Sequence, residues 1–445
     1  MPTNKLRLIL LILSINIFFE IPTSEAQDTT QKIITWLTQN SFSIKDIELG
    51  KGFSDLQPLK KILQDVQVIG MGEATHGTSE FFQFKARLVE FLVSEMGFTA
   101  LALESTFSNC EPINDYILSG KGDLYSALAQ QGYSVWNTEE FADLLIWLKE
   151  YNRKVSDERK VHFYGIDFIA FPIVGAEKTI AYFKSFAPTQ AYTADSILHM
   201  LANKKGDSST IISLNRLISF LLMNKDKLVS ASSLDQWEQT SKYLEVIEQR
   251  HSIFFGVPSS LGVPKQSRDE YMTNLLLYVI EKERPNVKIM FWAHNDHVEI
   301  DTLDNYPGGK TMGYYLRQKF GKKYYAVGLQ CNEGKYHARL QGDDGVFKAF
   351  ITDTILAIQN SFAWYLNKTE KGNSFIDFRL TPTNFLIDQW LDAKMKFVNG
   401  SWHHKSPKEN YDYIRLKDKY DGIVYLAHST PSHLTKNALR GMQQP

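Results

Sequence analysis

Several short apolar runs in this sequence end directly at an ionisable side chain, and this feature constrains the fold more than any other. Residues 100–103 (ALAL) are continuous in aliphatic side chains, as is typical of strands that are covered on both faces. One such run leads into residues 72–77 (GEATHG), and others end at Glu104, Asp167 and His294. Strands of this kind form parallel sheets, whose carboxyl ends meet at one edge. The sequence therefore predicts polar side chains gathered at that edge.

The rest of the pattern predicts an α/β fold with a mostly parallel central sheet flanked by helices. Residues 80–96 lie between the first two runs and carry apolar side chains at helical spacing, as a helix linking parallel strands would. Six segments have the composition of buried strands: Val66–Met71, Thr99–Leu103, Val161–Ile166, Lys288–Ala293, Tyr324–Leu329 and Gly422–Leu426. Residues 176–283 instead show long amphipathic patterns, so we expect a helical subdomain inserted there.

The first 26 residues have the features of an export signal. Basic side chains at positions 5 and 7 precede an apolar run over residues 8–19, and Ser24-Glu25-Ala26 offers a small-x-small cleavage site. The run is too short to span a bilayer comfortably, which disfavours a membrane anchor. We therefore predict a signal peptide over 1–26 and a mature domain over 27–445. The mature protein would be periplasmic or extracellular, with no membrane association.

Net charge and cysteine content restrict the partners further. The formal net charge is −1, so no overall field favours nucleic acid. Cys110 and Cys331 could pair in an oxidising compartment, and the sequence leaves a disulfide and two separate thiols as open alternatives. The oligomeric state is open as well.

The polar strand ends carry the residue types of acid–base catalysis. Glu73, His76, Glu104, His294 and His297 would converge at one sheet edge. A histidine near its ordinary pKa takes a proton from water at neutral pH, and a neighbouring carboxylate orients it and stabilises the imidazolium. Each residue alone also has a structural interpretation, since Glu73 could cap the following helix. A divalent metal bound by the same side chains is the minority alternative.

Other catalytic routes lack their motifs. The sequence contains no Gly-x-Ser-x-Gly element, no phosphate-binding Walker pattern and no His-Glu-x-x-His zinc signature. Neither cysteine lies in a recognisable nucleophile context. Water is therefore the expected nucleophile, and we predict a hydrolase that needs no cofactor.

At these positions the sequence resembles the erythromycin esterase family. The most specific similarity lies in residues 68–82 (VIGMGEATHGTSEFF) and 292–297 (WAHNDH). Supporting similarity is found in residues 163–167, 268–274, 312–316 and 420–431. The resemblance implies an α/β core with a helical insertion, and hydrolysis of an ester by activated water. In such enzymes the substrate is a macrolide lactone, which is opened to a linear hydroxy acid.

The resemblance also implies a role for each matching residue. His76 looks like the general base, Glu73, Glu104 and His294 would orient groups or stabilise charge, and His297 would support them. The family typically has a basic residue nine positions after the motif histidine, which here is Lys85 in place of the common arginine, with Arg87 two residues later. Four further residues are expected to bind substrate or support the site: Arg87, Asp167, Arg268 and Asn295. Which of Lys85 and Arg87 serves the site is left open.

The leading expectation is an exported carboxylic ester hydrolase that opens macrolide lactones and so confers antibiotic resistance. In one alternative the protein is still a hydrolase, but its substrate is another ester, a lactone or an amide. A second alternative is a binding protein that retains the cleft without turnover. Buried ionisable groups are costly without a task, which disfavours that second alternative.

Overall fold

The computed structural model describes residues 24–203, 208–256, 266–301, 309–342 and 347–441. Within these ranges one sheet has nine strands, in the order β1-β8-β11-β6-β2-β5-β3-β4, with β7 paired to the far part of β6. A separate two-stranded sheet joins β9 and β10. The strands are β1 (Ser41–Ser43), β2 (Val68–Met71), β3 (Ala100–Thr106), β4 (His162–Asp167), β5 (Ile289–Trp292), β6 (Tyr324–Gln341), β7 (Phe347–Ile355), β8 (Ser374–Asp377), β9 (Met395–Val398), β10 (Tyr411–Ile414) and β11 (Gly422–Ser429).

The centre of the sheet is parallel. The six strands β11, β6, β2, β5, β3 and β4 pair in parallel with one another, and each overlaps one of the six predicted segments. The predicted α/β fold with a mostly parallel sheet is therefore confirmed. Antiparallel partners extend it, with β8 and β1 beyond β11 and with β7 along the far part of β6.

Helices cover both faces of the sheet. Successive side chains on each central strand point to opposite faces, so each strand packs against both layers of helices. Leu101 and Leu103 pack with helices α3–α6, whereas Ala100 and Ala102 pack with α1, α12 and α14–α16. The helices on these two faces are α1 (Ser24–Asn40), α2 (Pro58–Ile62), α3 (Ser79–Met96), α4 (Glu111–Ser119), α5 (Leu124–Gln130), α6 (Glu139–Lys154), α12 (Arg268–Lys282), α14 (Met312–Phe320), α15 (Phe362–Asn367) and α16 (Phe385–Asp392). Short helices α13 (Asn295–Val298), α17 (Leu416–Lys419) and α18 (Lys436–Gly441) complete this part.

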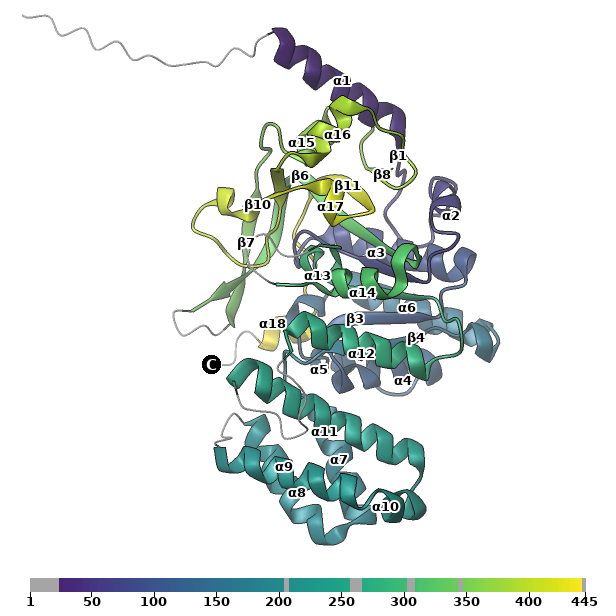
Figure 1. Ribbon diagram of the computed structural model, residues 1–445, viewed down its shortest axis with the longest axis vertical. Coiled ribbons are helices and arrows are strands. Elements are labelled where there is room, and N and C mark those ends of the chain that lie inside the picture. Colours follow the sequence, from purple (N-terminus) through teal and green to yellow (C-terminus); the bar gives the residue numbers. More distant parts are fainter. Residues whose placement is uncertain (1–23, 204–207, 257–265, 302–308, 343–346, 442–445) are drawn as a thin grey trace, which may run out of the picture.

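A group of helices follows β4 and lies at one end of the molecule, opposite α1, α15 and α16 (Figure 1). Its members are α7 (Ile173–Phe186), α8 (Pro188–Ala202), α9 (Ser208–Met223), α10 (Lys225–Ala231) and α11 (Leu234–Phe255). Their buried side chains form a separate apolar cluster, to which Phe183, Leu214 and Leu244 belong. Helix α12, which also falls within 176–283, packs its apolar side chains against the sheet instead.

The structure describes only the last three residues of the predicted export signal, 24–26. Residues 1–23 lie outside the described ranges, and α1 begins at Ser24. In the described part of the chain, no helix is long and apolar enough to cross a bilayer. Cys110 and Cys331 are buried free thiols, which answers the question that the sequence left open. Burial raises the pKa of the Cys331 thiol to about 12.

Candidate active site

The loop after β2 places a fully buried glutamate at the centre of a hydrogen-bond network. Oε1 of Glu73 accepts from Nδ1 of His76 at 2.8 Å. Its Oε2 accepts from Nζ of Lys85 at 2.9 Å and from the indole N–H of Trp292 at 3.0 Å. Because β2 delivers Glu73, α3 delivers Lys85 and β5 delivers Trp292, this carboxylate joins three elements. We call Glu73, His76, Glu104, His294 and His297 the Glu–His cluster.

His76 has the protonation pattern of a base. Since Glu73 only accepts, Nδ1 carries the hydrogen and Nε2 carries the lone pair. Burial lowers the pKa of His76 below its ordinary value, although Glu73 and Glu104 act in the opposite direction, so the ring is neutral near pH 7. Rings of His294, Trp136 and Tyr133 surround it, with centroids at 4.9, 5.2 and 5.6 Å.

Glu104 ends the apolar stretch of β3 and binds three donors. Its Oε1 accepts from Arg268 at 2.9 Å and lies 3.2 Å from Nε2 of His297, and its Oε2 accepts from the backbone N–H of His294 at 2.9 Å. Burial alone would raise the pKa of Glu104, but the charge and hydrogen bond of His297 and the charge of Arg268 hold it well below its usual range. The side chain is therefore a carboxylate that fixes the position of β5's end.

Two cations on the far side of Glu104 are themselves neutralised. Arg268, at the first position of α12, binds Asp167 through Nε at 3.2 Å and NH2 at 2.6 Å. His297 lies between Glu104 and Asp269, with Nδ1 2.9 Å from the Asp269 carboxylate. Burial would lower the pKa of His297, but these two carboxylates raise it well above its ordinary value. These contacts fix His297 between Glu104, Asp269 and Arg268, whose NH1 lies 3.2 Å from Nε2 of His297.

His294 caps α13 and is the histidine next to the base. Its Nδ1 lies 3.4 Å from the Asp296 carboxylate, and its Nε2 lies 3.4 Å from the carbonyl oxygen of Ala74. Burial would lower the pKa of His294, but Asp296 and Glu104 raise it above its ordinary value. Two adjacent histidines thus have opposite pKa shifts, which is the arrangement of a base beside a proton donor.

The structure decides between the two basic residues of α3. Lys85 lies in the site, and its ammonium is 4.2 Å from the ring centre of Trp292. Burial lowers the pKa of Lys85 to about 8, against the opposing effect of Glu73. Arg87 is a correction: it binds Asp55 with two hydrogen bonds, of 2.6 and 3.0 Å, away from the Glu–His cluster. Two positions along a helix turn the side chain by roughly 200°, which carries Arg87 to another face.

Asn295 has a structural contact rather than a free polar group. Its amide exchanges two hydrogen bonds with the backbone of Leu329, of 3.0 and 3.1 Å. These bonds tie α13 to β6 and so hold the neighbouring His294 in place. Of the residues expected at the site, the structure brings together all except Arg87.

Several residues at the site were not predicted. Asp269 and Asp296 are each adjacent to a residue that the sequence did single out, so that the matching segments contained their signal. Tyr133 and Arg339 had no such signal, since one lies in a loop before the short helical turn Ser134–Trp136 and the other lies far along β6.

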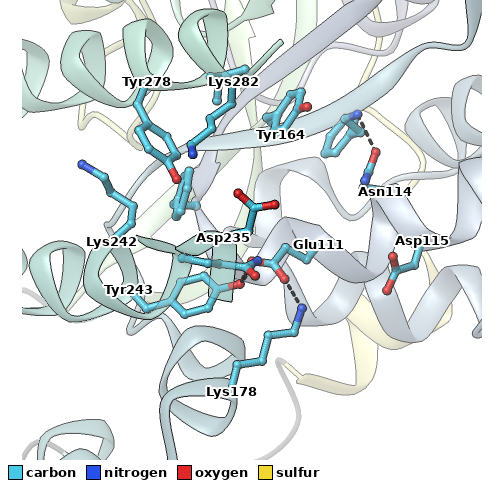
Figure 2. A pocket seen from close by; sticks show the side chains of 14 residues that line it. Glu111, Asn114, Asp115, Tyr164, Lys178, Asp235, Lys242, Tyr243, Tyr278 and Lys282 are labelled. Carbon is cyan, nitrogen blue, oxygen red and sulfur yellow. Dashed lines mark hydrogen bonds and ion pairs between the residues drawn. The ribbon is translucent and has the colours of Figure 1, made fainter. Parts of the chain in front are cut away.

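A cavity of about 520 Å³ lies elsewhere, between α4, β4, α7, α11 and α12. Figure 2 shows Lys178 reaching across to Glu111, whose other oxygen accepts from the hydroxyl of Tyr243 at 2.5 Å. No member of the Glu–His cluster lines this cavity. Within the described ranges, no three His, Cys, Asp or Glu side chains are placed to hold a metal ion.

The mostly parallel α/β sheet thus carries a carboxylate-bound histidine at its carboxyl edge, and the relatives of the chain indicate a hydrolase. The chain belongs to the erythromycin esterase family, whose characteristic sequence pattern matches residues 93–429. That match begins within α3, after Glu73 and His76. The chain is 24% identical to the erythromycin esterase type II of Escherichia coli, over 90% of this chain and 98% of that protein.

Solved structures share the fold. One is described as a succinoglycan biosynthesis protein, with a TM-score of 0.75 and 25% identity, covering 92% of this chain and 100% of that one. A mutant of the erythromycin esterase EreC, in its open conformation, has a TM-score of 0.64 and 19% identity over 88% of this chain and 98% of its own. The second likeness concerns the fold alone.

Proposed function

We propose that this protein hydrolyses a carboxylic ester with water activated by His76. The observation that carries the proposal is the Glu73–His76 pair: Nδ1 is bound to a buried carboxylate at 2.8 Å, Nε2 keeps its lone pair, and burial keeps the pKa of His76 below its ordinary value. A neutral imidazole oriented in this way is a general base at neutral pH.

In this mechanism Nε2 of His76 takes a proton from water while the water oxygen attacks the ester carbonyl carbon. Glu73 stabilises the imidazolium that forms. The tetrahedral intermediate then collapses, the bond to the alkoxide breaks, and the alkoxide takes the proton back from His76. The products are a carboxylic acid and an alcohol. Glu104 holds the backbone of His294 beside the reaction, and Arg268 and His297 hold Glu104.

We propose macrolide lactones as the substrate class and antibiotic resistance as the biological role. The support is family membership, together with a match that covers nearly the whole length of a relative named as an erythromycin esterase. Another ester or lactone is the second candidate, because the structural likeness to the succinoglycan biosynthesis protein has the higher TM-score. Export before hydrolysis is part of the proposal, with the mature chain beginning at Gln27.

The test is mass spectrometry of erythromycin and a small macrolide panel after incubation with purified mature protein. We expect a macrolide to gain the mass of one water, and His76→Ala to abolish that gain while the circular dichroism spectrum stays the same. Hydrolysis of a different ester in a wider panel would replace the macrolide as substrate. A wild type that hydrolyses no ester, or a folded His76→Ala with full activity, would overturn the proposal.

Two further measurements address the rest of the proposal. Because the mechanism uses no metal, incubation with a chelator should leave the rate unchanged, and inactivation that zinc reverses would contradict it. The mass of protein recovered from the exported fraction should correspond to a chain that begins at Gln27. A mass that retains residues 1–26 would contradict export by signal cleavage.

A further inference from the structure

Ester hydrolysis by water places negative charge on the carbonyl oxygen, and an enzyme of this kind needs a donor aimed at that oxygen. The two long basic side chains beside the Glu–His cluster, Lys85 and Arg268, are poor candidates because each is already bound to a carboxylate. Lys85 is bound to Glu73 at 2.9 Å. Arg268 is bound to Glu104 at 2.9 Å and to Asp167 at 2.6 Å. A donor outside these pairs is required.

The phenol of Tyr133 meets this requirement. Its ring lies edge-on to the ring of His76, with centroids 5.6 Å apart, and its side chain is 7% exposed. Burial raises the pKa of Tyr133 to about 12, and the charge of Glu104 contributes in the same direction. The hydroxyl is therefore protonated throughout the range in which His76 acts as a base, and it lies close enough to the Glu–His cluster to sense its charge.

Arg339 leaves the hydrogen of this hydroxyl available. NH1 of Arg339 donates to the Tyr133 oxygen at 2.8 Å. A guanidinium has no acceptor, so the hydroxyl hydrogen must point to another group, and in the described part of the chain no side chain or backbone group accepts it. The guanidinium also lies over the rings of Trp402 and Tyr133, at 4.3 and 4.8 Å. A charged donor on the oxygen makes the remaining O–H a stronger donor.

The loop that carries Tyr133 is held rigidly. Oε1 of Gln131 accepts from the backbone N–H of Tyr133 at 3.0 Å, and the side-chain amide of Gln131 donates to the Tyr133 carbonyl. Ser105, next to Glu104 on β3, donates to the Gln131 carbonyl at 2.8 Å. Gly132 between them has φ +96°, and a Cβ there would lie 2.6 Å from the Cβ of Ala170. The hydroxyl is therefore fixed relative to β3, as a preorganised donor must be.

We propose that Tyr133, polarised by Arg339, donates a hydrogen bond to the ester carbonyl oxygen and stabilises the oxyanion during attack by water. This inference rests on the proposed ester hydrolysis. As the water oxygen bonds to carbon, the π electron pair moves onto the carbonyl oxygen and is held by the Tyr133 O–H. The pair returns when the alkoxide leaves, and Tyr133 keeps its proton throughout.

The test compares Tyr133→Phe with Tyr425→Phe in steady-state kinetics on the best substrate of the ester panel. Tyr425, on β11, is a matched control. Its ring is also buried, and its hydroxyl donates to Asn367 at 3.0 Å, outside the Glu–His cluster. For Tyr133→Phe we expect kcat to fall about 100- to 1,000-fold with KM nearly unchanged. The control should keep the wild-type kcat, and thermal unfolding should show that both variants are folded.

Arg339→Met tests the polarisation. Alone it should lower kcat roughly tenfold, since a hydrogen bond from a charged donor is lost. Added to Tyr133→Phe it should cause no further loss, because Arg339 acts through the hydroxyl that is already absent. An unchanged kcat in Tyr133→Phe, a rise in KM alone, or additive losses in the double variant would overturn the inference.

The proposed function and this inference fail in different ways. A wild type that is active, with Tyr133→Phe equally active, rejects only the role of Tyr133. A wild type that hydrolyses no ester rejects the proposed function and the inference with it.

Discussion

At the scale of single residues, the local environment gives the three histidines of the site different pKa shifts. Burial next to one carboxylate leaves His76 with a lowered pKa. Contact with two carboxylates raises the pKa of His297 well above its ordinary value. His294 lies between these extremes, with a raised pKa that Asp296 and Glu104 produce against burial. Sequence showed that all three reach one edge, whereas their charge depends on neighbours from other strands.

Lys85 should set the alkaline limit of activity. Its pKa is lowered to about 8 by burial, so it loses its proton as the pH rises through that value and leaves the Glu73 carboxylate without its cation. We expect kcat to fall above about pH 8. In Lys85→Arg the charge persists to much higher pH, so the alkaline limit should move upward. A pH–rate profile that is the same in both proteins would contradict this account.

Glu104→Gln should reduce both stability and activity. It removes the charge that balances Arg268 and His297, and breaking a buried pair costs about 3 kcal/mol. Displacement of His294 should lower kcat about 100-fold. Asp55→Asn is the control, because it breaks a buried pair with Arg87, of 2.6 Å, outside the site. Denaturant unfolding and kinetics should show that Asp55→Asn loses stability but not kcat, and equal effects on kcat would reject the distinction.

The sequence predicted those site residues whose place depends only on their position at the end of a strand. Glu73, Glu104 and His294 follow buried strands, so parallel pairing alone brings them together. Arg87 was wrongly assigned because a family motif gives spacing without helix phase. Tyr133 was missed because its place depends on the side-chain bonds of Gln131 and on contact with Arg339, a partner that is 206 residues away.

At the scale of elements, the parallel strands were predictable and the antiparallel ones were not. The central strands are covered on both faces and therefore read as continuous apolar runs. By contrast, most side chains of β7 are only partly buried, and β1 has only three residues. Such strands form because an existing edge offers them hydrogen bonds. Strand β6 also continues well beyond its predicted end, and Gly334, at φ +140°, lies where its partner changes from β11 to β7.

The loop after β2 should not tolerate a side chain at Gly77. A Cβ there would lie 2.0 Å from the carbonyl oxygen of His337 on β6. We expect Gly77→Ala to cost on the order of 1–3 kcal/mol through overpacking and to lower kcat by displacing His76. Gly97→Ala is the comparison, since its φ is +74° with no atom within 4 Å. It should lose about 1 kcal/mol of stability with kcat unchanged, as thermal unfolding and kinetics would measure.

At the scale of the whole molecule, two kinds of core support the fold. The sheet lies between two apolar clusters, one on each face, whereas α7–α11 surround a third cluster of their own. The amphipathic patterns over 176–283 predicted helices there. They did not reveal that α12 faces the sheet, since periodicity shows which side of a helix is apolar but not what covers it.

Hydrogen exchange should separate these cores. We expect amides of α7–α11 to exchange faster than those of β2, β3 and β5, because a small separate cluster opens at lower free energy than the whole fold. Leu214→Ala should accelerate exchange in α7–α11 alone, whereas Leu101→Ala, in the sheet core, should accelerate it throughout. Both side chains are fully buried. The exchange would be measured by mass spectrometry. Equal exchange rates across all helices and strands would show that the fold opens as a single cooperative unit.

The outer part of β6, with Arg339 and its contact at Trp402, belongs to the last third of the chain, while the base and its carboxylates come from the parallel strands. Changes in the outer part of β6 can therefore act on the contact between Arg339 and Tyr133 without touching the residues that move the proton. Substitutions that accumulate there would tune the rate of the reaction, while Glu73 and His76 continue to transfer the proton.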